Sequence, residues 1–183
     1  IARIHEQHPD IVKVHTSLIN QGKGAAIRFG LEFATGDVIL IQDADLELNP
    51  EEYPMLLAPI LRGETDVVYG SRFRGRSGNI LLRTRLANWF LTLLTNLLYG
   101  SRLTDMATAY KVFRSTVIKR LKLRSARFEF EPEVTAKLLL AGYKILELPI
   151  SYNPRSVAEG KKVGWIDGIE YIYTLLKCRF FEG

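Results

Sequence analysis

The sequence has little of several features that mark special classes of protein. One cysteine, Cys178, among 183 residues excludes an internal disulfide and a cysteine-rich metal site, and it favours a reducing compartment such as the cytoplasm. Proline and glycine are sparse, and 47% of the residues are hydrophobic. This composition excludes a disordered chain. The positive excess is small, 25 basic against 20 acidic residues, so charge alone does not identify a partner.

The sequence also lacks an apolar run long enough to cross a membrane. The longest such run, residues 86–99, is interrupted by two asparagines and two threonines and falls short of the ~20 residues that a bilayer requires. The chain starts at Ile1 without a charged leader, an apolar stretch and a cleavage site, so we expect no signal peptide. Its length predicts one domain.

Apolar periodicity and turn signals predict alternating helices and strands. Asn49, Pro50 and the acids that follow them mark one helix start, and Ser115 is expected to cap another. Alternation of this kind favours an α/β sheet that binds ligands at the carboxyl ends of its strands. The expected strands are 12–16, 38–42, 66–69, 110–113 and 144–150, and the expected helices are 24–35, 49–63, 82–99, 115–122 and 131–141.

The most informative segment is Gln42-Asp-Ala-Asp-Leu-Glu47, which follows an apolar run typical of a parallel strand buried on both faces. Carboxylates at i and i+2, here Asp43 and Asp45, leave a strand on the same side. They suit Mg²⁺ or Mn²⁺, hard ions that bind oxygen and bridge to substrate phosphates, and Glu47 can add a ligand or hold one. The alternative is an acidic loop that caps the next helix, because an isolated D-x-D is a weak signal.

Four motifs in a fixed order resemble those of inverting family 2 glycosyltransferases, and most closely those of the polyprenyl-phosphate (dolichyl-phosphate) sugar synthases. The resemblance covers essentially the whole chain. It implies a GT-A fold (a Rossmann-like mixed sheet with helices on both faces), a nucleotide-sugar donor such as UDP-glucose or GDP-mannose, Mg²⁺ or Mn²⁺, and a polyprenyl-phosphate acceptor. The motifs are Asn20-Gln-Gly-Lys-Gly24, Gln42-Asp-Ala-Asp-Leu-Glu47, Asp66-Val-Val-Tyr-Gly-Ser-Arg-Phe73 and Leu103-Thr-Asp-Met-Ala-Thr-Ala-Tyr-Lys-Val-Phe113.

On the donor side, the resemblance assigns Asp43 and Asp45 to the metal and the diphosphate, with Gln42 in the same donor motif. Glu47 stands where relatives have a further acid or amide that contacts the metal. Lys23 lies between two glycines but lacks the following Ser or Thr of a P-loop. Because a glycine-rich helix entrance can still bind phosphate through its backbone amides, we expect Lys23 to contact the donor.

On the acceptor side, Arg72 matches the arginine that similar enzymes direct at the acceptor phosphate, and Arg85 matches a second one. Arg155, together with Lys161 or Lys162, resembles a basic flap that closes on phosphates. A phosphate acceptor is already anionic, so its attack needs positioning and charge neutralisation more than proton abstraction.

The Thr104-Asp105 pair matches the acceptor-side motif near the transferring sugar. A hydroxyl acceptor would need a general base within ~3 Å, and Asp105 is the carboxylate we nominate for that role. Asp105 can equally hold Arg72 or cap a turn after Thr104. The expected catalytic residues are therefore Asp45, Asp105 and Arg72.

One departure from the family concerns the amino-terminal end. Similar enzymes begin with a strand that ends in a proline- and acid-containing motif for the nucleotide base, and no such segment precedes Ile1. The resemblance thus implies a catalytic domain over 1–183 that is amino-terminally truncated, with an incomplete base pocket.

Two helical segments carry apolar stripes next to basic residues. Residues 82–99 begin with Arg83 and Arg85, and residues 165–180 include Lys177 and Arg179. Core packing explains most stripes of this kind, but interfacial helices share the pattern. We therefore expect peripheral contact with the cytoplasmic face of a membrane.

Three functions are consistent with the sequence. The first is transfer of a hexose, glucose or mannose, from a nucleotide-sugar to polyprenyl phosphate with inversion. The second is extension of a cell-surface glycan at a hydroxyl. The third is a non-catalytic module that binds nucleotide-sugar or membrane. We expect no nucleic-acid partner.

Overall fold

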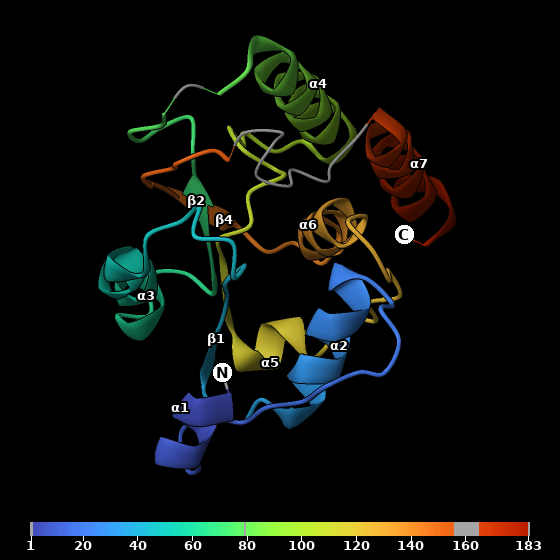
Figure 1. Ribbon diagram of the computed structural model, residues 1–183. Coiled ribbons are helices and arrows are strands. Elements are labelled where there is room, and N and C mark those ends of the chain that lie inside the picture. Colours follow the sequence, from blue (N-terminus) through green and yellow to red (C-terminus); the bar gives the residue numbers. More distant parts are fainter. Residues whose placement is uncertain (1, 79, 156–164, 183) are drawn as a thin grey trace.

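A computed structural model describes residues 2–78, 80–155 and 165–182. Four strands form one mixed sheet in the order β1-β3-β2-β4 (Figure 1). Strand β3 is antiparallel to both of its neighbours, whereas β2 and β4 are parallel. The strands are β1 (Val38–Ile41), β2 (Val67–Ser71), β3 (Lys111–Arg114) and β4 (Ile145–Pro149).

Helices cover both faces of the sheet, as the GT-A resemblance predicts (Figure 1). On one face, Tyr69 and Phe113 pack against α5 and α6, with α2 alongside. On the other, Val68 and Val112 pack against α3. The helices are α1 (Ala2–Gln7), α2 (Lys23–Phe33), η1 (Pro50–Glu52), α3 (Tyr53–Leu61), α4 (Leu82–Tyr99), α5 (Ser115–Ile118), α6 (Phe130–Leu140) and α7 (Trp165–Phe181).

A third apolar cluster joins α4, α6 and α7 beside the sheet (Figure 1). Leu91 of α4 and Leu175 of α7 are buried in it, and the Tyr99 hydroxyl donates to the Leu175 carbonyl at 2.6 Å. Within the described residues, no helix is both long and apolar enough to span a bilayer.

The expected strand over 12–16 is wrong, because these residues lie outside every helix and strand. Alternating polarity does not provide a hydrogen-bonding neighbour, and in the described part of the chain the sheet ends at β1. The expected parallel strand over 38–42 is also wrong in type. Strand β1 pairs only with β3, in antiparallel register, and Ile41 is its one buried residue.

The helix predictions are more accurate. The predicted segment 82–99 coincides with α4, and the Asn49 side chain accepts a hydrogen bond from Glu51 N at 3.1 Å, as a cap should. The Ser115 cap is wrong: α5 has no side-chain cap and stops at Ile118, before the predicted end at residue 122.

Candidate functional site

The predicted site residues follow strands that end at one edge of the sheet. Because β3 is antiparallel to β1 and β2, and β4 is parallel to β2, the strands β1, β2 and β4 point the same way. Their carboxyl ends lead to Asp43, Arg72 and Arg155 respectively. Binding sites of α/β sheets lie at such an edge.

Asp43 is paired with a lysine from the start of α2. The Lys23 ammonium lies 2.8 Å from Asp43 Oδ2 and 2.8 Å from Glu131 Oε1 on α6. Burial lowers the pKa of Lys23, but the carboxylates of Glu131 and Asp43 outweigh that effect and raise it above its ordinary value. Burial raises the pKa of Asp43 against the opposing effect of Lys23, and the charges of Glu131 and Asp45 add to the rise.

Asp45 lies in a tight turn with an unusual backbone. Leu46 has φ of 62°, in the left-handed region that a leucine rarely adopts, and its side chain is exposed. Glu47 N donates to Asp45 Oδ1 at 3.3 Å within this turn. Arg155 crosses from the β4 side and donates from Nη2 to Asp45 Oδ2 at 2.8 Å. Strain of this kind occurs at ligand sites in many proteins.

The Glu47 carboxylate is occupied by residues that follow β4. It accepts from the Tyr152 hydroxyl at 3.1 Å and from Arg155 N at 2.9 Å, and Arg155 Nε lies 3.4 Å away. Burial and Glu47 raise the pKa of Tyr152 to about 12 against the opposing charge of Arg72. In this structure Glu47 therefore ties residues 152–155 to the acidic turn, and its role as a metal ligand stays a prediction.

Asp43 and Asp45 have the right chemistry for Mg²⁺ or Mn²⁺. Among the described residues no three acidic, histidine or cysteine side chains converge as a complete metal cage. Mg²⁺ does not need one, since it is commonly bound by one or two carboxylates together with substrate phosphates. The two aspartates therefore fit a metal that is shared with a diphosphate.

The Gln42 side chain is half-buried and hydrogen-bonded to the protein. Its Nε2 donates to the Asp43 carbonyl at 2.5 Å, and its Oε1 accepts from the Tyr53 hydroxyl at 3.1 Å. These bonds fix the backbone before the acidic turn. Donor binding by Gln42 stays a prediction.

Arg72 and Asp105 form a two-pronged ion pair. Arg72 Nε donates to Asp105 Oδ2 and Arg72 Nη2 to Oδ1, each at 2.7 Å, and Arg72 N also donates to Oδ2 at 3.0 Å. Asp105 is fully buried, and its charge raises the pKa of Arg72 although burial acts in the opposite direction. Of the roles open to Asp105 from the sequence, the structure has it holding Arg72, with both oxygens engaged.

The other predicted acceptor residues are less constrained. Arg155 pairs with the acidic turn, as described above. Arg85 is exposed in the first turn of α4 and makes no ion pair with a described residue. Lys161 and Lys162 lie outside the described residues.

The sequence model of the family described as glycosyl transferase family 2 matches residues 1–122, about two-thirds of the chain. The chain belongs to glycosyl transferase family 2. The family membership that the four motifs predict is therefore confirmed.

Two relatives have names that include a polyprenyl phosphate. The chain is 28% identical over 162 residues to a dodecaprenyl-phosphate galacturonate synthase from Rhizobium johnstonii, covering 88% of this chain and 47% of that protein. It is 30% identical over 149 residues to an undecaprenyl-phosphate mannosyltransferase from Micrococcus luteus, covering 79% and 60%. The chain thus spans about half the length of these relatives.

Solved structures agree on the fold of this family 2 chain. Glucosyl-3-phosphoglycerate synthase from Mycobacterium tuberculosis superposes with a TM-score of 0.66 at 18% identity, covering 96% of this chain and 60% of that one. The same enzyme crystallised with Mn²⁺, UDP-glucose and phosphoglyceric acid gives a TM-score of 0.60 at 21% identity, covering 95% and 59%. The GT-A fold is confirmed.

Sequence reasoning missed three buried charged residues around this family 2 site: Glu131, Lys111 and Glu147. Glu147 accepts from the Thr104 backbone and hydroxyl and from Asp105 N, all within 3.0 Å, and so fixes the segment that carries Asp105. A signal existed for Lys111, which is the one charge in the expected strand 110–113.

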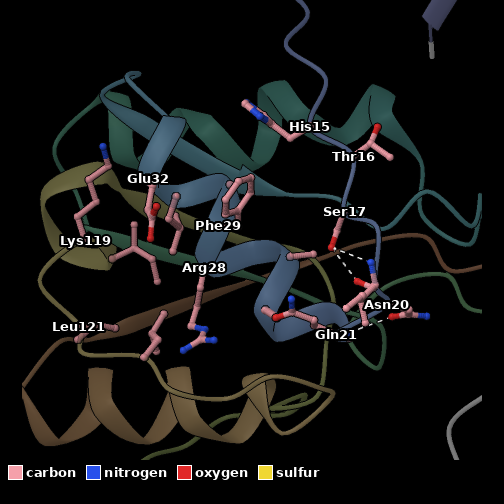
Figure 2. Close-up of a pocket in the computed structure, with 18 residues that line it drawn as sticks. His15, Thr16, Ser17, Asn20, Gln21, Arg28, Phe29, Glu32, Lys119 and Leu121 are labelled. Atoms are coloured by element: carbon pink, nitrogen blue, oxygen red, sulfur yellow. Dashed lines mark hydrogen bonds between the residues drawn. The ribbon is translucent and has the colours of Figure 1, made fainter.

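A cavity of about 1330 Å³ lies between α2 and the preceding segment 15–22 (Figure 2). His15 and Phe29 face it from the two sides, and residues 118–123 close part of its wall. It contains none of the predicted site residues, although Gly22 in its lining is next to Lys23.

Proposed function

We propose that this protein transfers a hexose from a nucleotide-sugar to a polyprenyl phosphate, with inversion and a divalent metal. Residues 1–183 would form its catalytic domain. The observation that carries the proposal is the division of charge along one sheet edge, with the aspartates in the turn after β1 and Arg72 after β2. Tyr152 connects the two, since its hydroxyl donates to Glu47 at 3.1 Å and its ring centre lies 5.2 Å from the Arg72 guanidinium carbon. A metal-bound diphosphate and an anionic acceptor need such an arrangement.

On the donor side, Asp43 and Asp45 would hold Mg²⁺ or Mn²⁺, which supplies charge neutralisation for the leaving diphosphate. Lys23 already lies 2.8 Å from Asp43, close enough to contact a phosphate held there. The named relatives transfer different sugars, so the choice of glucose or mannose, and of UDP or GDP, is part of this proposal.

On the acceptor side, the geometry favours a phosphate over a hydroxyl. Asp105 accepts three hydrogen bonds from Arg72 and is fully buried, so it is poorly placed to remove a proton. The Arg72 side chain is 17% exposed, and its ion pair with Asp105 orients the guanidinium. An oriented guanidinium is well suited to bind phosphate.

The lipid acceptor agrees with the outer faces of α4 and α7, which lie side by side (Figure 1). A soluble monomer rarely leaves so much apolar surface on adjacent helices, whereas an interfacial helix does. Basic residues such as Arg83 and Lys177 flank the stripe and suit anionic lipids at the cytoplasmic face. The exposed residues are Leu82, Leu86, Trp89, Phe90 and Leu97 on α4, and Ile166, Ile169, Tyr173, Phe180 and Phe181 on α7.

Thermal unfolding with Mn²⁺ and either UDP-glucose or GDP-mannose tests the donor half. A donor that binds only the folded state should raise the melting temperature by roughly 5–10 °C at a hundredfold excess over Kd. Asp45→Asn should lose most of that rise. Equal shifts in the two proteins would remove Asp45 from the metal site.

Radiolabelled sugar with a polyprenyl phosphate tests the acceptor half. Label should enter the organic-extractable lipid fraction. Label that enters a glycan instead would select hydroxyl transfer. Donor binding without any turnover would select the non-catalytic reading.

A further inference from the structure

Four charges of alternating sign run from the core to the acidic turn. Lys111 Nζ donates to Glu131 Oε2, Glu131 Oε1 lies 2.8 Å from Lys23 Nζ, and Lys23 Nζ lies 2.8 Å from Asp43 Oδ2. The row comes from four elements, since these residues belong to β3, α6, the start of α2 and the end of β1.

The inner half of the row is inaccessible to water. The Lys111 side chain is fully buried and that of Glu131 is 4% exposed. Burial raises the pKa of Glu131, yet the ammoniums of Lys111 and Lys23 outweigh this effect and lower it below its ordinary value. Glu131 is therefore a fixed negative charge, which a buried carboxylate remains only beside cations.

Lys111 and the helix α6 hold Glu131 rigidly. Lys111 Nζ also donates to the carbonyls of Met106, at 3.1 Å, and Thr108, and it lies 4.6 Å from the centre of the Tyr69 ring. Glu131 lies in the first turn of α6, where the helix dipole stabilises a carboxylate. The carboxylate that Lys23 contacts is thus fixed independently of the donor site.

Lys23 has two carboxylate partners: a bound ligand would also engage Asp43, but it would not engage Glu131. Asp43 is partly exposed at 32% of its side chain and is a predicted ligand of metal and diphosphate, whereas Glu131 faces the interior. A lysine on its flexible four-carbon stem loses side-chain entropy when it is ordered for a ligand. A second, permanent carboxylate imposes that order beforehand.

We propose that Glu131 is a positioning residue that holds the Lys23 ammonium at the donor diphosphate while Asp43 is engaged by a ligand. The inference rests on the proposed function. It also links the two halves of the site, because Lys111 connects Glu131 to the segment 106–108 that follows Asp105. The competing explanation is that Glu131 only neutralises the buried charge of Lys111.

A pair of variants in the full chain separates these explanations. Glu131→Gln alone would leave Lys111 as a buried charge without a counter-ion and endanger folding. We therefore compare Lys111→Met, which keeps the Glu131–Lys23 pair, with the double variant Lys111→Met/Glu131→Gln, which removes the buried pair as a unit. The probes are Mn²⁺ alone, measured by the EPR signal of free Mn²⁺, and UDP or GDP with Mn²⁺, measured by calorimetry.

The proposal predicts that the double variant melts close to Lys111→Met but binds the nucleoside diphosphate about tenfold more weakly, the size of one lost charge-assisted hydrogen bond. Equal affinity in the two proteins would reduce Glu131 to a counter-ion of Lys111 and overturn the proposal. If wild type binds neither nucleotide with Mn²⁺, the proposed function itself fails, which is a different result.

Lys23→Met supplies a second test that does not depend on the core variants, since it leaves the Lys111–Glu131 pair in place. It should bind nucleoside diphosphate about tenfold more weakly, again the loss of one charge-assisted contact. It should bind Mn²⁺ alone at least as tightly as wild type, because a competing cation has left Asp43. Unchanged nucleotide affinity in Lys23→Met contradicts the proposal.

Discussion

Asp105 shows how much of the site depends on single ion pairs. Asp105→Asn keeps the shape of the side chain but removes the charge that Arg72 faces with two of its nitrogens. A largely buried guanidinium would then lack a counter-ion, and we expect the free energy of unfolding to fall by about 2–4 kcal/mol in urea titrations. Turnover should fall more than donor affinity does, because we propose that Arg72 binds the acceptor phosphate.

Asp66→Asn is a matched control for that variant. Asp66 pairs with Arg114 at 2.6 Å, but the two side chains are 46% and 38% exposed. Water screens such a pair, so the free energy of unfolding should fall by no more than about 1 kcal/mol. Similar decreases in the free energy of unfolding of Asp66→Asn and Asp105→Asn would show that burial does not determine how much the Arg72–Asp105 pair stabilises the protein.

Individual residue roles were only partly predictable from the sequence. Asp43, Asp45 and Arg72 could be singled out because motifs carry them. Glu147 could not, since alternation in β4 would place it outside and Leu146 inside, whereas Glu147 is buried and Leu146 is 37% exposed. Hydrogen bonds from Thr104 and Asp105 reverse the expected polarity, and those partners are 43 and 42 residues away in the chain.

Among the elements, α6 contributes a pH-dependent stability through Glu133. This carboxylate accepts from the backbone of Arg124 and Ser125, within 3.0 Å, and from Lys137 Nζ at 2.6 Å. Burial raises the pKa of Glu133, but these bonds lower it below its ordinary value of 4.5. The stabilisation is therefore fully present above pH 4.5 and is lost as the pH falls through the lower pKa of the folded state.

Glu133→Gln removes this titration. We expect its free energy of unfolding at neutral pH to be lower than that of wild type, and the difference to shrink as the pH falls below 4.5. Urea unfolding at a series of pH values measures the difference at neutral pH and its decrease at low pH. Glu32→Gln, at an exposed position of α2, should follow wild type throughout. A Glu133→Gln curve that stays parallel to wild type would rule out the assigned pKa direction.

Elements with a strong local signal were predictable, and those that need a partner were not. Helix α4 has its boundaries as predicted because eighteen residues of helical periodicity end at Gly100, whose φ of 66° suits a C-terminal cap. Residues 12–16 alternate as a strand should, yet a strand forms only beside another. Likewise, the antiparallel direction of β3 depends on how the chain folds back, which local periodicity does not encode.

On the scale of the whole molecule, the apolar faces of α4 and α7 predict binding to lipid. Replacing Leu86 and Trp89 by serine should weaken sedimentation with vesicles of anionic phospholipid by at least about tenfold, given the free energy of burying two large side chains. Leu61→Ser removes a leucine that is 71% exposed, compared with 55% for Leu86, from α3, across the sheet from α6 (Figure 1), and should leave binding unchanged. Equal loss in both variants would mean that the contact is nonspecific.

Strand β1 has a further consequence, because it lies at the end of the described sheet with β3 as its only neighbour. Its outer row of backbone donors and acceptors recognises an extended backbone of any sequence. Its side chains, Val38 to Ile41, carry no charge that would repel a second β1. If residues 1–183 are prepared alone, we expect aggregates at high concentration to arise from the outer edge of β1 in one folded molecule pairing with that edge in another, without unfolding.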